Sequence, residues 1–99
     1  MKIIKNQNGG SLTIALEGRL DTSTAPELEQ AIKGSLDGVT ELVMDFARLD
    51  YISSAGLRVL LSARKTMSKQ GSMKVIHVNE MVMEVFEVTG FSDILTIEQ

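Results

Sequence analysis

Two adjacent serines, Ser53 and Ser54, carry the hydroxyls of this sequence that are best placed to do chemistry. They precede a segment with helical apolar spacing, so both are expected at a helix start, where backbone N–H groups lack partners. A negative charge is favoured there by roughly 0.3–1 kcal/mol. One serine can act as the N-cap, which is the stronger interpretation from residue type alone. The other serine then has no capping role, and its hydroxyl is a candidate for phosphorylation.

The residues needed for hydrolysis or for binding phosphate in a glycine-rich loop are missing. A nucleophile elbow requires glycine two residues to either side of the serine, and around Ser54 only Gly56 meets this requirement. The single histidine, His77, lies in an expected strand and is interpreted as structural. Asp45 and Asp50 are expected to have no partner base, metal or cleft. We therefore predict no catalytic residue and no enzyme activity.

Length, charge and cysteine content exclude further classes. The 99 residues are expected to form one domain, residues 1–99, and the net charge of -3 argues against nucleic acid as a partner. Without cysteine and with one histidine, no metal site and no cofactor are predicted. No apolar run reaches membrane-spanning length and the first residues are too polar for a secretory signal. The expected location is the cytoplasm, without a membrane partner.

These serines are expected to lie between a strand and a helix of an α/β fold. In chain order the expected elements are a hairpin 2–17, a loop 18–24, a helix ended by Gly34 or Gly38, a strand 41–46, a loop 47–54, a helix 54–69, a strand 73–78, a helix 80–89 and a strand 94–97. The order β-β-α-β-α-β-α-β predicts a mainly parallel sheet with an antiparallel N-terminal edge strand and helices packed on it. Loops at the carboxyl ends of the strands then place Asp21 and Ser54 at one end of the molecule.

The polar residues before the first helix have two interpretations. Thr24 with Glu27 resembles a capping box, whereas Ala25 is the alternative cap, because the residue before Pro26 avoids the helical region. Asp21 is interpreted first as a turn residue and second as part of a polar site.

The last helix is expected to be capped by Asn79 and to bury a stripe that includes Val82 and Phe86. Met81 and Met83 flank this stripe. They are interpreted as packing residues, with a partner-binding patch as the alternative.

Two separated segments resemble the signatures of STAS domains, the bacterial anti-sigma factor antagonists. Residues 45–61, above all Tyr51-Ile52-Ser53-Ser54-Ala55-Gly56-Leu57-Arg58, resemble the segment that carries a phosphorylated serine. Residues 18–25, Gly-Arg-Leu-Asp-Thr-Ser-Thr-Ala, resemble the polar loop before the first helix. Length and element order match over essentially the whole chain.

The resemblance implies a partner-switching regulator. Such proteins bind, when unphosphorylated, an anti-sigma factor that is also a serine kinase of the histidine-kinase-like ATPase class. The kinase phosphorylates the antagonist, the complex separates, and a PP2C-type phosphatase removes the phosphate. The residues that the resemblance assigns to partner binding are Asp21, Thr22, Ser23, Ser53, Ser54, Ala55, Gly56 and Arg58.

The sequence departs from the family motif, which reads roughly Asp-Ser-Ser/Thr-Gly-Leu-Gly. Alignment on Gly56 and the leucine after it implies that Ser54 is the acceptor, with Ser53 as the alternative because it replaces the aspartate. Ala55 stands where a second hydroxyl residue is usual. Arg58 replaces the last glycine and lies one helical turn from Ser54, where it can pair with a phosphate or remain a solvated arginine.

A second functional interpretation is a constitutive STAS adaptor, such as a small subunit of a transporter or another signalling complex, without phosphorylation. In either case we expect a monomer or a weak dimer, because the exposed edge strand permits pairing without requiring it.

Overall fold

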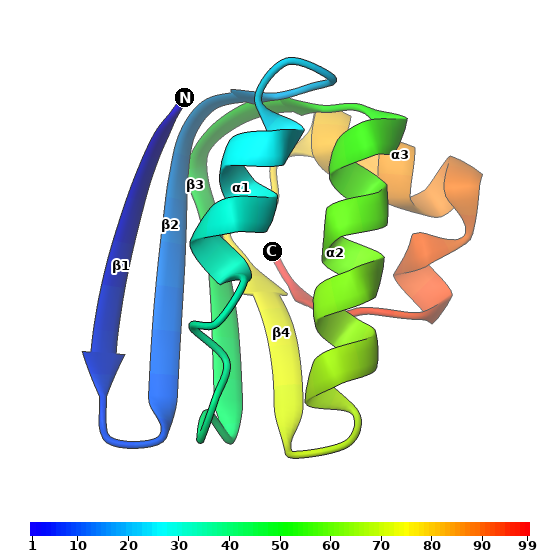
Figure 1. Cartoon of the computed structure of the whole chain (residues 1–99). Helices are drawn as coiled ribbons and strands as arrows, with labels where there is room; N and C mark the ends of the chain where they lie inside the picture. The colour runs from blue at the N-terminus through cyan, green and yellow to red at the C-terminus, as the bar shows by residue number, and fades with distance from the viewer.

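The strands of the sheet lie side by side in the order in which the chain makes them (Figure 1). The computed structural model describes all 99 residues. β1 is antiparallel to β2, and every later neighbouring pair is parallel. The strands are β1 Lys2–Asn8, β2 Ser11–Leu20, β3 Glu41–Ile52, β4 Ser72–Ile76 and β5 Thr96–Glu98. The predicted mixed α/β sheet with an antiparallel edge strand is therefore confirmed.

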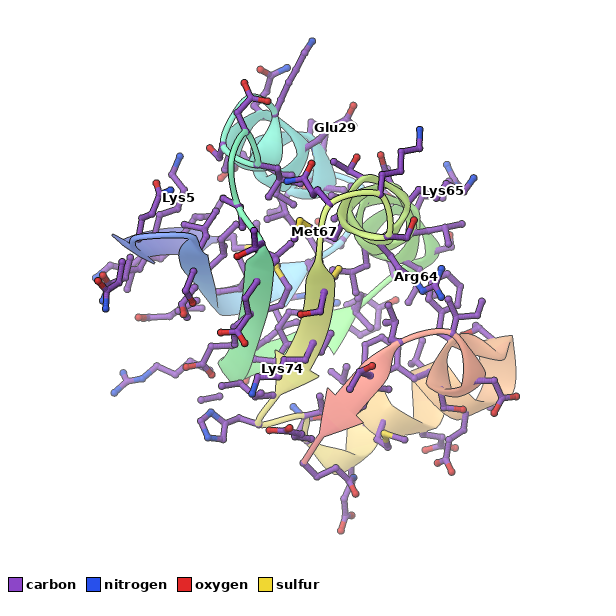
Figure 2. The ribbon with its side chains drawn as sticks, turned by 90° about the horizontal axis from the view of Figure 1, so that it is seen from below. Lys5, Glu29, Arg64, Lys65, Met67 and Lys74 are labelled. Atoms are coloured by element: carbon purple, nitrogen blue, oxygen red, sulfur yellow. The ribbon has the colours of Figure 1, made fainter.

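Three helices connect the parallel strands: α1 Ala25–Ile32, α2 Ser54–Met67 and α3 Glu80–Thr89. α1 and α2 lie next to each other over one face of the sheet, and α3 lies on the side of α2 away from α1 (Figure 1). Met67 projects from α2 toward the sheet and is buried, whereas Lys74 lies on the sheet face away from α1 and α2 (Figure 2). None of the helices is long and apolar enough to cross a membrane.

β2 and β3 are both longer than predicted. β2 continues to Leu20, and β3 continues to Ile52, so most of the expected loop 47–54 is strand. Beyond Asp45, β3 no longer pairs with β4 and pairs only with β2. Two register shifts between β2 and β3 interrupt the alternation of buried and exposed residues. A strand that contains bulges no longer shows the period of two by which strands are recognised in a sequence.

The chain connections also differ from the predicted boundaries. α1 ends before Gly34, which has a φ of 80°. Leu36, expected in the apolar stripe of this helix, is buried beyond its end. A short 3-10 turn, η1 (Phe91–Asp93), occupies the segment before β5, and β5 consequently begins two residues later than predicted.

Gly71 lies where the turn between α2 and β4 crosses the start of β3. A Cβ atom on Gly71 would overlap the backbone carbonyl of Thr40. The same carbonyl accepts a hydrogen bond from the N–H of Ser72 at 2.9 Å, so it is held in place by the first residue of β4. Gly71 is therefore needed for a close approach of two backbones; α2 itself ends at Met67, two residues earlier than predicted.

Asn79 caps α3, as predicted, and also joins this helix to β3. Its side-chain oxygen accepts the N–H of Val82 at 2.8 Å, and its side-chain nitrogen donates to the carbonyl of Leu49 at 2.8 Å.

We expect Asn79→Ala to lower the free energy of unfolding by about 1–2 kcal/mol, because both partners lose a hydrogen bond. Urea denaturation measures this loss. Asn79→Ser keeps a capping oxygen but loses the bond to Leu49, so it should give a smaller loss; equal losses would contradict the role of the cap.

Candidate functional site

The carboxyl ends of β2 and β3 bring the two signature segments together. The N–H of Ser53 donates to the carbonyl of Leu20 at 2.9 Å, which joins the last residue of β2 to the first residue after β3. Asp21 follows Leu20 directly and Ser54 follows Ser53 directly. The expectation that Asp21 and Ser54 lie at one end of the molecule is thus confirmed.

Asp21 organises the loop that precedes α1. Its Oδ1 accepts hydrogen bonds from the hydroxyl of Ser23 at 2.7 Å and from the N–H groups of Ser23 and Thr24 at 3.0 and 3.2 Å. The hydroxyl of Ser23, together with these N–H groups, holds the pKa of Asp21 below its ordinary value, although burial acts in the opposite direction. The turn interpretation of Asp21 is confirmed, and the turn fixes the exposed side chains of Thr22 and Ser23 beside the site.

The predicted capping box between Thr24 and Glu27 is absent. Thr24 occupies the N-cap position of α1, but its side chain makes no capping hydrogen bond. Instead, its Oγ1 donates to the carbonyl of Arg19 at 2.8 Å and accepts the N–H of Asp21 at 2.8 Å. The hydroxyl is therefore used to close the loop on β2. Ala25, the alternative cap, is the first residue of the helix.

The two serines at the start of α2 have different surroundings. Ser53 is the N-cap residue with an extended backbone, but its Oγ is buried and makes no hydrogen bond. Ser54 is the first residue of this 14-residue helix and is exposed. Of the two hydroxyls, that of Ser54 is thus the one open to an approaching protein, at the positive end of the helix dipole.

A groove of about 570 Å³ runs between α1 and α2 from this end of the molecule. Thr22, Ala55 and Arg58, three of the residues assigned to partner binding, line it. Arg58 is exposed and takes part in none of the three salt bridges of the structure. Its guanidinium is therefore free to pair with a charge introduced at Ser54, four residues earlier on the helix.

Gly56 is buried beneath this surface. A Cβ atom there would lie 2.6 Å from Cγ of Leu20 and 3.0 Å from Cγ1 of Ile52. The missing side chain lets the first turn of α2 approach the ends of β2 and β3 closely. Gly56 therefore positions the exposed residues around it and offers no side chain of its own to a partner.

Arg19 and Tyr51 add a surface contact that was not predicted from the sequence. The guanidinium of Arg19 lies 4.3 Å from the centre of the Tyr51 ring, and its Nε lies 3.8 Å from Oδ2 of Asp21. Both residues belong to the signature segments, and they are directly paired across β2 and β3. Recognising that pairing from the sequence required knowing that both strands continue this far.

The contact between His77 and Asp45 corrects two predictions. His77 lies outside β4, with a φ of 58°, and its Nδ1 is 2.9 Å from Oδ1 of Asp45. Asp45 therefore does have a partner base. Glycine, asparagine, aspartate and histidine adopt this left-handed conformation more readily than other residues, which explains how the chain turns at His77. No His, Cys, Asp or Glu side chains are grouped in threes that could hold a metal ion.

Burial raises the pKa of Asp45, but the hydrogen bonds from His77 and from the N–H of Ala47 outweigh the effect of burial, so the pKa of Asp45 lies below its ordinary value. Because protonation of Asp45 is harder in the folded state, this stabilisation is complete above the pKa of Asp45 in the unfolded chain and is lost as the pH falls through its folded-state pKa.

We expect Asp45→Asn to reduce the loss of stability between roughly pH 5 and pH 2, measured by urea denaturation. His77→Asn, which suits the left-handed backbone, should raise the pKa of Asp45; an unchanged pKa would contradict this assignment.

Comparisons with known proteins agree with the fold and with the signature segments. The STAS domain family matches residues 2–99. BtrV of Bordetella bronchiseptica, described as a candidate anti-sigma factor antagonist, is 38% identical over 99 residues, which cover 98% of this chain and 85% of BtrV. The chain therefore belongs to the STAS domain family, among relatives that are anti-sigma factor antagonists.

Solved structures show the same fold. An anti-sigma factor antagonist from Mycobacterium paratuberculosis superposes with a TM-score of 0.89 at 23% identity, covering 98% of this chain and 84% of its own. The Bacillus cell fate determinant SpoIIAA, solved in its phosphorylated form, superposes with a TM-score of 0.76 at 18% identity, covering 99% and 92% of the two chains.

Proposed function

We propose that this protein is an anti-sigma factor antagonist that works by partner switching. The unphosphorylated protein binds an anti-sigma factor that is also a serine kinase of the histidine-kinase-like ATPase class, and so frees a sigma factor in the cytoplasm. The kinase transfers the γ-phosphoryl group of ATP to Oγ of Ser54, which loses its proton, and ADP leaves. The complex then separates. A PP2C-type phosphatase hydrolyses the phosphoserine to serine and inorganic phosphate.

The observation that carries this proposal is the exposure of Ser54 at the first residue of α2, beside a neighbouring serine whose Oγ is buried. Phosphate at this position would add about 1.5 to 2 negative charges where the helix dipole favours them. Arg58 is the one basic side chain one turn away, and we assign it to the phosphate. The phosphorylated form in which SpoIIAA was solved supports the same chemistry.

The surroundings of Ser54 support a regulator and argue against a hydrolase. Nucleophilic serine requires a base within hydrogen-bond reach, and the only histidine is bonded to Asp45 instead. The partner surface that we propose consists of the exposed residues around Ser54 and the turn held by Asp21. Gly56 acts beneath it, and Ser53 contributes its backbone, since its hydroxyl is buried.

Kinase assays with an anti-sigma factor of the histidine-kinase-like ATPase class that binds the unphosphorylated protein test the proposal. We expect the wild-type protein to gain the mass of one phosphoryl group with ATP, Ser53→Ala to gain it equally, and Ser54→Ala to gain none. Ser53→Ala is a suitable control because it removes a hydroxyl that makes no hydrogen bond, so the fold should be preserved. If wild type binds its partner but gains no mass, the constitutive adaptor replaces the switch; a gain that survives Ser54→Ala moves the site elsewhere.

A further inference from the structure

Two parallel rows of side chains run along α3, and all of their members except Val85 are exposed. The rows, each with the spacing i, i+4, i+7, are Glu80-Glu84-Glu87 and Met81-Val85-Val88. Met81 is 58% exposed and Val88 is 80% exposed, whereas Met83 and Val85 pack against the core. The expectation that Met81 is a packing residue is therefore wrong. Two of the large apolar side chains most open to solvent thus flank a row of carboxylates on one helix.

Two features of the charge pattern of this helix oppose its stability, although Glu80 lies in the first turn, where the helix dipole favours a negative charge. Glu80 and Glu84 are like charges four residues apart, and Glu87 lies in the last turn, where the helix dipole favours basic residues and none is present. None of the three glutamates takes part in a salt bridge. Residues 78–99 contain no lysine or arginine at all. Local conflicts of this kind are expected where a surface serves another purpose.

We propose that this face of α3 is a docking surface for a basic amphipathic helix of a partner protein. The apolar row of such a helix would pack on Met81 and Val88, and lysines or arginines beside that row would pair with the glutamates. The charge of α3 determines this occupant, because an acidic partner or an anionic lipid surface would be repelled. A second copy of the chain does not supply the matching helix: α2 is basic but has no large apolar side chain among the exposed ones.

This surface is separate from the one around Ser54. α3 lies on the side of α2 away from α1, and the two views agree on this placement (Figures 1 and 2). The groove between α1 and α2 contains no residue of α3. The two proposals therefore rest on different residues and can fail independently.

Titration with designed helical peptides tests the proposal on the full chain. The probe is a peptide with one leucine row flanked by lysines, and its control has the same leucines flanked by glutamates. We expect the lysine peptide alone to bind, with amide chemical shift changes in ¹⁵N-labelled protein centred on α3. The double variant Met81→Ser with Val88→Ser should weaken binding by about tenfold, because both apolar contacts are lost.

Charge variants separate specific pairing from general attraction. Glu84→Gln with Glu87→Gln should weaken binding and reduce its dependence on salt, whereas Glu27→Gln with Glu29→Gln on α1 removes the same charge and should have little effect. Several outcomes would overturn the proposal: no binding of the lysine peptide, equal effects of both glutamine pairs, or shift changes away from α3. If sedimentation shows a concentration-dependent dimer of the wild-type protein, and Met81→Ser with Val88→Ser abolishes that dimer, the partner on this face is a second copy of the chain instead.

Discussion

Replacing Gly71 with alanine is expected to lower the free energy of unfolding by at least about 3 kcal/mol. The added Cβ would overlap the carbonyl of Thr40, a backbone group that cannot rotate away and that is bonded to the N–H of Ser72. The start of β3 and the turn before β4 would have to separate. For a chain of this size, the midpoint of thermal unfolding should fall by roughly 10–20 °C, measured by circular dichroism.

Gly10→Ala provides a matched control, because its Cβ would also meet Thr40. There the neighbour is the side-chain Oγ1, at 2.8 Å, which can rotate out of the way. We expect Gly10→Ala to cost about 1 kcal/mol. If the two alanine variants have the same stability, the close approach of the two backbones at Gly71 is not what determines the cost.

Ser54→Glu is expected to weaken binding to the partner kinase by about a hundredfold, while Ser54→Ala retains most of the affinity. A carboxylate at this position must be desolvated or expelled when the complex forms. The same carboxylate should stabilise the free protein by about 0.3–1 kcal/mol, because it lies at the N-terminus of α2. A loss of affinity together with a gain in stability distinguishes an interface effect from damage to the fold. Calorimetric titration and thermal unfolding measure the two quantities.

Thr66→Glu is the control for this substitution. Thr66 is exposed on the same helix, about 18 Å along its axis from Ser54. It should leave the affinity within about twofold, since surface charges beyond a Debye length are largely screened. Ser54→Glu with unchanged affinity would show that residue 54 lies outside the interface.

Local patterns in the sequence made much of the fold predictable. The hairpin at the N-terminus, the stripe of Val82 and Phe86, and the cap at Asn79 all depend on interactions between residues that are close together in the sequence. The extent of β3 was not predictable in this way, because the bulges leave Phe46, Leu49 and Ile52 buried at a spacing of three. The role of Gly71 was not predictable from local patterns, since its contact with Thr40 joins residues that are far apart in the sequence.

The candidate site was predicted from its signature residues, but their individual roles required coordinates. The sequence favoured Ser54 as the acceptor and kept Ser53 as the alternative, and only packing distinguishes a buried Oγ from an exposed residue. Thr24 was assigned to the helix cap because its spacing to Glu27 fits, whereas its hydroxyl bonds to the carbonyl of Arg19. Such competition between local and tertiary hydrogen bonds is decided by geometry that no short motif records.

The agreement between strand order and chain order has a consequence for how the protein is made. Each strand pairs with the one synthesised just before it, so no strand needs to wait for a distant partner to leave the ribosome. Every connection then closes a short stretch of chain, which lowers the entropic barrier to folding. Assembly during translation can therefore proceed strand by strand from the hairpin, with β5 added last at the opposite edge.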